Sequence, residues 1–456
     1  MILSFNVGRS ATPFFSRIFS SRRSKSECLD VAYRGDYHLW RQAIRSRLTI
    51  SSDARHEDMT AEYPPERRRI KASMQNFVWM ATIILSVVIL FPKLDQNVLV
   101  DFGSSWSAAR LLCHGANPYD VRSLLRMEKT TGWVLSEAVV PWNPPWALSI
   151  MIPFSFLPFV YAKWVWTAVN GFLILALADY WWRLYGGTLE HRMASWLAAL
   201  WFFPCIVALY FGQTSLIVLA GVTGIEWSLR RRKTPWLSFF ILLAALKPHL
   251  LLPMWLILIL WLTRQKQWKM LAWASSGIVL ACIVVGSFRP EVYSDYVLRV
   301  TSIQGPVIWA TPTIGTALRV AFPNIPKWIV FLPGFCGLLL SMIFLRRLRG
   351  AFTWKRHLDL ILLLSLTTAS YAWIFDWAIL LPIVIRVLVW FGSSPRQQWS
   401  SMGGLVCAMI VFVWEQARGL FPLGAVWFPW GLMLVYVWAR RQQDRIEAIE
   451  MRSPLS

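Results

Sequence analysis

The sequence has few charged residues and few cysteines, and each shortage excludes a class of protein. Charged side chains make up 15% of the 456 residues, whereas hydrophobic side chains make up 56%. This balance is too apolar for a soluble globular protein of this length. The six cysteines stand singly and far apart, without a C-x-x-C pair. The sequence therefore predicts neither a disulfide framework nor a zinc site, and no metal or cofactor is expected.

Acidic residues are also scarce, with 24 Asp and Glu against 46 Lys and Arg and a formal net charge of +22. An excess of this size can indicate nucleic-acid binding. Here, however, the basic residues fall in short clusters between apolar runs, which is typical of the cytoplasmic loops of a membrane protein. The sequence therefore predicts a polytopic membrane protein whose partner is the lipid bilayer, with no nucleic-acid partner.

Long apolar runs recur along the chain, as at residues 77–91 and 164–182. A helix needs about 20 apolar residues to cross a hydrocarbon core of about 30 Å. With every basic cluster on the cytoplasmic side, spans are predicted near residues 76–93, 160–182, 194–211, 214–229, 270–286, 326–345, 358–371, 377–392, 401–416 and 423–439. Residues 144–158 then dip in without crossing, and residues 233–264 form a hairpin of half-length helices. We expect an all-α membrane bundle of about a dozen membrane helices.

Three parts of the chain are distinguished by composition. Residues 1–75 carry 14 basic and 8 acidic residues with Ser-rich stretches, which predicts a cytosolic, disordered basic extension. Residues 76–440 are expected to form the membrane domain, and residues 441–456 a cytosolic tail. Within the membrane domain, residues 102–136 have apolar residues at helical spacing. They are predicted to form an external module of short amphipathic helices on the bilayer surface.

The predicted topology collects polar residues on the outer face. They are Asp101, Arg110, Asn117, Tyr119, Asn143, Gln213, Lys247, His249 and Asp376. Ionisable residues within apolar sequence are costly, and they usually line a cavity or a pathway. We therefore expect the functional site on the outer face.

Asp101 lies just after the first predicted span, in the sequence LVDFGSSW. A carboxylate at the membrane boundary can take a proton from a substrate hydroxyl. The alternative is that Asp101 caps the helix that follows, because aspartate is a favoured N-cap residue. The sequence position by itself favours capping.

Lys247 places a cation in the apolar hairpin, next to the helix-breaking Pro248. No carboxylate is near in the sequence, and a buried unpaired ammonium is costly, so an anionic partner such as a lipid phosphate is implied. The alternative is a lysine that snorkels to the interface. His249 by itself is more typical of a structural histidine.

Asp376 is the second carboxylate on the outer face, and its alternative role is an ion pair with Arg289 or Arg319. Three further motifs are typical of turns or extended segments: NPY at residues 117–119, NPP at residues 143–145 and GQ at residues 212–213. Each of these motifs has a purely structural explanation.

Asp101 and four of these short motifs occur in a definite order along the chain. The order is Asp101, GANPY at residues 115–119, NPP at residues 143–145, GQ at residues 212–213 and KP at residues 247–248. Over residues 76–440 this ordered set resembles the polyprenol-phosphate-dependent membrane glycosyltransferases of family 87, which include bacterial α-mannosyltransferases. Residues 1–75 have no counterpart in the resemblance.

The resemblance implies a GT-C fold and a catalytic role for Asp101, because the family's candidate base is an aspartate in the first external loop. It also implies transfer of a mannose-like hexose from a polyprenyl-phosphate sugar to a glycan or glycolipid hydroxyl. The family often has Ser-Pro and a histidine before a late span, whereas this chain reads SYAWIFD at residues 370–376. Because Asp376 falls near the histidine position, donor or acceptor preference is expected to differ.

The chemistry of such a transfer agrees with a single base. A departing lipid phosphate is a good leaving group that needs cations rather than a general acid, so we assign Lys247 and His249 to the donor phosphate. The remaining predicted cavity residues are Arg110, Asn117, Tyr119, Asn143, Gln213 and Asp376. A Gly-rich nucleotide loop and a D-x-D pair are both absent from the sequence, which fits a lipid-borne donor and an inverting reaction at the outer face of the plasma membrane.

A lipid-linked saccharide flippase or transporter is the alternative from another class. It would use the same apolar bundle, with Lys247 and Asp376 as charges along a path. Transporters are often built from two related halves with paired broken helices. The sequence has one broken hairpin and no convincing internal repeat, which favours the transferase.

Overall fold

The computed structural model describes residues 99–134, 136–189, 191–302, 305–348, 352–391 and 423–452. Within these ranges the ordered elements are all helices, so the all-α prediction is confirmed. The predicted extension 1–75 and the predicted spans at residues 76–93 and 401–416 lie outside the described residues.

Among the described residues, four helical segments are long and apolar enough to cross a bilayer. They are α6 (Phe159–Tyr185), α12 (Trp268–Phe288), η3 with α16 (Lys327–Arg347) and η4 with α18 (Ile374–Phe391). Two bent pairs raise the number to six if each pair counts as one span: α7 (Arg192–Trp201) with α8 (Phe203–Phe211), and α10 (Thr234–Ala244) with η2 (Pro248–Leu251) and α11 (Leu252–Arg264). The described residues thus establish a membrane-type helical protein, and the count of about a dozen stays a prediction.

Prolines produce both bends. Pro204 stands in the first turn of α8, where the chain turns by 60° from α7. Pro248 opens η2 and Pro253 lies in the first turn of α11, where the hairpin bends by 109°. Proline lacks the N–H that would continue the preceding helix and clashes with its last turn. The split of residues 233–264 into half-length helices therefore follows from local sequence.

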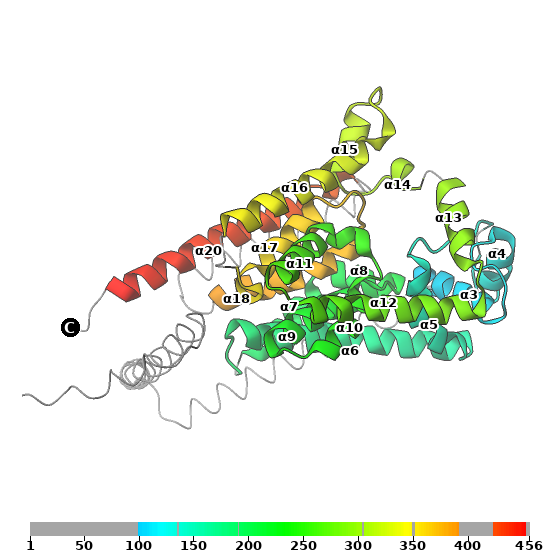
Figure 1. Ribbon diagram of the computed structural model, residues 1–456, viewed down its shortest axis with the longest axis horizontal. Coiled ribbons are helices and arrows are strands. Elements are labelled where there is room, and N and C mark those ends of the chain that lie inside the picture. The colour runs from blue at the N-terminus through cyan, green and yellow to red at the C-terminus, as the bar shows by residue number, and fades with distance from the viewer. Residues whose placement is uncertain are drawn as a thin grey trace, which may run out of the picture. The chain divides into compact units, whose positions relative to one another are not determined.

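The helices pack in two groups (Figure 1). Helix α9 (Ser215–Arg231) in the first group and α11 in the second each contact a helix of the other group. One group contains α6, α9, α10 and α12, and the other contains α11, α16, α17 (Trp354–Thr367) and α20 (Phe428–Arg452). Almost every side chain of α9 is buried. In contrast, α12 and α16 expose large apolar side chains, including Leu280, Ile283 and Phe335, as expected of helices that face lipid.

The predicted external module is only partly correct. Helix α4 (Val121–Lys129) is amphipathic, with Leu124 buried and Arg126 exposed. Helix α3 (Val100–Cys113) is not, because nine of its residues are buried, Phe102 and Trp106 among them. Its small residues let α5 (Leu148–Ser155) pack closely on it. The prediction that α3 is an amphipathic helix is wrong, since the spacing of its apolar residues does not reveal that its small polar residues are buried too.

The segment between α12 and η3 carries three short helices, α13 (Val292–Ser302), α14 (Gly305–Ile308) and α15 (Ile314–Ala321). Before α5, η1 (Pro145–Ala147) starts the short apolar helix predicted at residues 144–158. At the other end, η5 (Leu423–Ala425) precedes α20, which continues as a helix into the predicted tail as far as Arg452.

Candidate active site

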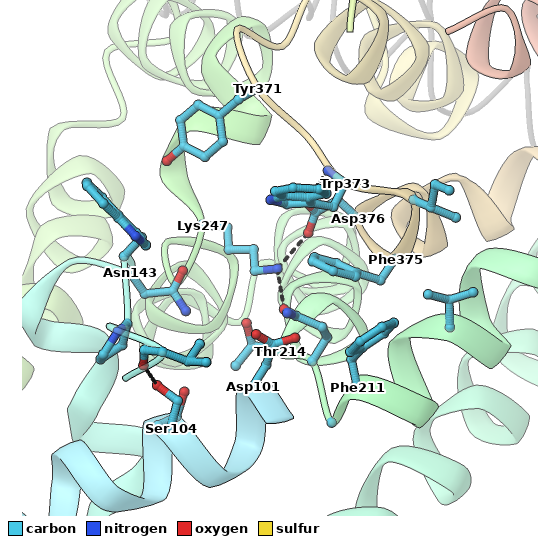
Figure 2. Close-up of a pocket in the computed structure, with 18 of the residues that line it drawn as sticks. Asp101, Ser104, Asn143, Phe211, Thr214, Lys247, Tyr371, Trp373, Phe375 and Asp376 are labelled. Carbon is cyan, nitrogen blue, oxygen red and sulfur yellow. Dashed lines mark hydrogen bonds and ion pairs between the residues drawn. The ribbon is translucent and has the colours of Figure 1, made fainter. Parts of the chain in front are cut away.

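A cavity of about 660 Å³ lies where α3, α8, the hairpin tip and the start of η4 meet. Figure 2 shows Asp101, Asn143, Thr214, Lys247 and Asp376 around it. Of the predicted site residues, it is lined by Asp101, Asn143, Gln213, Lys247, His249 and Asp376. The fold therefore brings together residues that are up to 275 positions apart in the sequence (376 − 101 = 275).

Arg110, Asn117 and Tyr119 were also predicted to line the cavity, and they are not among its lining residues. The Arg110 guanidinium donates to the Ser155 carbonyl at 2.5 Å. The Asn117 side chain accepts from the Tyr119 backbone N–H at 2.8 Å, which makes it a turn residue. The Tyr119 ring is buried. Arg110 therefore ties α3 to α5, Asn117 shapes the turn before α4, and the Tyr119 ring belongs to an apolar core cluster.

The turn at Gly212 sets the position of Gln213. Helix α8 ends at Gly212 in the left-handed conformation, with φ +68°, and the Gly212 carbonyl accepts from the Trp166 indole at 2.9 Å. A Cβ at this position would lie 2.7 Å from the Cβ of Phe102. Only glycine fits both the backbone conformation and the close approach of α3.

We expect Gly212→Ala to lower the melting temperature of the purified protein and to reduce its activity. The left-handed conformation costs a non-glycine residue about 1–2 kcal/mol, and the clash with Phe102 adds to this cost. Gly186→Ala is a matched control, because Gly186 has φ +93° and a Cβ added there would meet nothing within 4 Å. Equal losses of stability in the two variants would show that the approach of α3 is not tight.

Lys247 is fully engaged within the protein. Its ammonium contacts Asp376 Oδ1 at 2.6 Å, Gln213 Oε1 at 2.6 Å and Ser215 Oγ at 3.1 Å. An ammonium has three N–H groups that donate hydrogen bonds, so each N–H group of Lys247 has an acceptor. The anionic partner that the sequence implied is present within the protein, because the counter-ion Asp376 comes from η4, 129 residues later.

Asp376 is buried, with 2% of its surface exposed. Its Oδ1 also accepts from the Ser215 hydroxyl at 2.8 Å, and its Oδ2 accepts from the Trp373 backbone N–H at 2.9 Å. The alternative pairing with Arg289 or Arg319 is wrong. Arg289 pairs with Asp295 at 2.7 Å, and Arg319 donates to the Trp309 carbonyl at 2.8 Å.

Asp101 lies in the first turn of α3, whose N-cap is Leu99 and shows no side-chain capping bond. The capping alternative is therefore wrong. The carboxylate receives a hydrogen bond from the Gln213 side chain and is only partly covered by protein. Burial raises the pKa of Asp101 to about 6, while the Gln213 hydrogen bond and the charge of Lys247 oppose this rise. Asp101 is the carboxylate that faces open space in the cavity.

Aromatic rings form another wall of the cavity, from Trp142, Trp309, Tyr371, Trp373 and Phe375. His249 stacks on Tyr371, with ring centroids 3.9 Å apart, and its Nδ1 lies 3.1 Å from the tyrosine hydroxyl. A mostly apolar wall with a few convergent polar groups is typical of a site for an organic ligand. These rings were not predicted as cavity residues, because aromatic residues are frequent throughout the chain.

Glu128 on α4 was also missed. It is buried, and both carboxylate oxygens accept from the Val139 backbone N–H, at 3.2 and 3.1 Å. Val139 lines the cavity, and its carbonyl accepts from Ser104 on α3. Burial raises the pKa of Glu128 to about 7. Glu128 thus holds the cavity wall at residues 138–143, a role that its place among the charged residues of α4 did not indicate.

The described part of the chain contains no group of three or more His, Cys, Asp and Glu side chains arranged to hold a metal. The chemistry that the cavity offers is proton acceptance by Asp101 and hydrogen bonding by Asn143, Ser104 and Thr214. The rings provide apolar contact surface for a ligand. Lys247 and Asp376 neutralise each other behind these groups.

Comparison with known proteins identifies one family. The family model of glycosyltransferase family 87 matches residues 142–370, just over half of the chain. Neither a curated protein nor a solved structure matches. The matched segment contains Asn143, Gln213, Lys247 and His249, and it covers neither Asp101 nor Asp376.

Proposed function

This chain belongs to glycosyltransferase family 87, and on that premise we propose that it moves a mannose-like hexose from a polyprenyl-phosphate sugar to a hydroxyl of a lipid or glycan acceptor. Family membership implies a membrane glycosyltransferase, which agrees with the apolar helices of the fold. The site is assigned to the extracytoplasmic face of the plasma membrane, because every basic cluster then stays on the cytoplasmic side.

The observation that carries the proposal is the difference between the two carboxylates of the cavity. Asp376 has both oxygens occupied within the protein, whereas Asp101 has a face open to the cavity. A single available carboxylate suits an inverting transfer, which needs one base. Glycoside hydrolases usually need two positioned carboxylates.

In the proposed step, the acceptor hydroxyl gives its proton to Asp101 as its oxygen forms a bond to the anomeric carbon of the sugar. The bond between that carbon and the phosphate oxygen breaks, and its electron pair leaves with the polyprenyl phosphate. The configuration at the anomeric carbon inverts, because attack and departure occur on opposite faces. The aromatic wall beside His249 offers apolar surface to the sugar ring.

We place the donor phosphate at the side of the cavity that Lys247 and His249 line. A phosphate oxygen can accept a hydrogen bond from the Lys247 ammonium in place of the Ser215 hydroxyl. The contact with Ser215 is the longest of the three, at 3.1 Å. The ion pair with Asp376 and the bond to Gln213 then stay intact. Charge-assisted hydrogen bonds of this kind stabilise the negative charge that develops on the leaving group.

The test is a transfer assay with purified protein in liposomes. Radiolabelled polyprenyl-phosphate mannose and a panel of glycolipid acceptors are supplied, and product and released polyprenyl phosphate are measured. Equal amounts of glycosylated product and polyprenyl phosphate are expected. Movement of intact donor lipid between leaflets without transfer would contradict the proposal and favour a flippase.

We expect the rate of transfer to rise with pH through about 6 and then to level off. A base must be deprotonated to accept a proton, and burial raises the pKa of Asp101 to about 6. Below this pH the carboxyl is protonated and cannot accept the proton of the acceptor hydroxyl. Initial rates between pH 4.5 and 8, with the donor saturating, measure the midpoint. A rate that falls as pH rises through 6 would contradict the role of Asp101.

A further inference from the structure

We propose that Gln213 is a positioning residue, whose side-chain amide orients the Asp101 carboxylate and ties it to the ion pair of Lys247 and Asp376. This inference rests on the proposed function, since it assigns Gln213 a role toward the base. It replaces the prediction that Gln213 contacts the substrate. The directions of the hydrogen bonds that the Gln213 amide makes support this role.

Lys247 fixes which way the Gln213 amide points. An ammonium donates hydrogen bonds and accepts none, so the amide atom 2.6 Å from Lys247 Nζ must be the oxygen, Oε1. The amide nitrogen then points away from Lys247. It serves as the donor in the hydrogen bond to the Asp101 carboxylate. Figure 2 shows the Lys247 ammonium with Asp376 on one side and Asp101 on the other.

The atoms behind Gln213 are also fixed. Ser215 donates to Asp376 at 2.8 Å and accepts from Lys247 at 3.1 Å, so the three side chains form a closed ring of contacts. Gln213 itself has 8% of its surface exposed and follows the left-handed turn at Gly212. Networks in which each member is satisfied hold a functional side chain in one orientation. Of the two N–H groups of the Gln213 amide, one is used toward Asp101.

The charged groups that face Asp101 are Lys247 on the hairpin and Asp376 on η4, with opposite effects on its protonation. The charge of Lys247 lowers the pKa of Asp101 and the charge of Asp376 raises it, so the two oppose each other. The hydrogen bond from Gln213 is the largest of the influences that favour the ionised base. A glutamate at position 213 would still accept from Lys247, but it would present a carboxylate oxygen to Asp101 in place of an N–H. Gln213→Glu therefore changes the contact with Asp101 and keeps the contact with Lys247.

The experiment measures Asp101 directly as well as the reaction. Carbodiimide reacts with protonated carboxyl groups, so labelling of the Asp101 peptide is followed by mass spectrometry from pH 4.5 to 8. In Gln213→Glu we expect the labelling midpoint to rise by about one pH unit or more, because a donor is lost and a like charge is gained. The midpoint of the pH–rate profile should rise by the same amount. A rise of about one pH unit should lower the kcat at pH 6.5 about 3-fold, because the ionised fraction of the base falls by that factor.

Gln443→Glu is the matched control, because Gln443 makes its hydrogen bond to Glu447 on α20, away from the cavity lining. It should leave the labelling midpoint unchanged. An unshifted midpoint in Gln213→Glu would overturn the inference, as would a raised KM for donor or acceptor with unchanged kcat and midpoint. Labelling needs no turnover, so it decides the role of Gln213 even if the transfer assay contradicts the proposed function.

Discussion

Asp101→Asn is expected to lower the rate of sugar transfer by about 10²–10⁴-fold, the usual cost of losing a general base. The substitution removes proton acceptance at nearly constant volume. Folding should be preserved, because Asp101 makes no capping bond that α3 requires. Initial rates with polyprenyl-phosphate mannose, measured beside the melting temperature of the same preparation, check this result.

Asp120→Asn is the matched control for this variant. Asp120 caps α4 by accepting from the Ser123 backbone N–H at 2.9 Å, and it does not line the cavity. Since asparagine caps a helix about as well as aspartate, the control should keep near wild-type activity and stability. Asp101→Asn with a near wild-type rate would remove Asp101 from the mechanism. Asp376 would then be the next carboxylate to examine.

Among the single substitutions considered, Lys247→Met is expected to lower the free energy of unfolding most. It leaves Asp376 with 2% of its surface exposed and without its counter-ion. Removing one partner of a buried ion pair costs about 3–5 kcal/mol. We therefore expect a marked fall in melting temperature and a low yield of folded protein in detergent, measured by thermal unfolding and size-exclusion chromatography.

The double variant Lys247→Met with Asp376→Leu tests the reason for this loss. Replacing both members of a buried pair with apolar residues is often neutral or stabilising, so the double variant should recover much of the stability. Arg289→Met is a further control, since its pair with Asp295 is partly exposed and is worth about 1 kcal/mol or less. A double variant no more stable than Lys247→Met would contradict the role of the ion pair.

Local and compositional features of the sequence were sufficient to predict the helical membrane class. The need for about 20 apolar residues per span is a property of the bilayer and can be read from the sequence. Prolines break helices through contacts within one turn, so the half-length hairpin around Lys247 and the short helix at residues 144–158 were also predictable. The ordered motifs pointed to the family that the match over residues 142–370 identifies.

The sequence also indicated most of the residues that line the cavity, because amides and charges are rare among apolar residues and costly to bury. Asp101, Asn143, Gln213, Lys247, His249 and Asp376 all line it. Their individual interactions were not predictable. Lys247 and Asp376 are 129 residues apart, and a pairing over that distance depends on how α9, the hairpin and η4 pack.

Tertiary structure alone decided three further points. It buried nine residues of α3, so this helix is not the amphipathic one that its apolar spacing predicted. It engaged Arg110 with α5 and Asn117 with its own turn, and it buried the Tyr119 ring in an apolar core cluster, so none of the three lines the cavity. It also left Asp101 open to the cavity while it enclosed Asp376. The physical reason is common to all three. A polar side chain bonds to whichever partner the packed helices bring within hydrogen-bonding distance, and the spacing of residues along the chain does not contain that information.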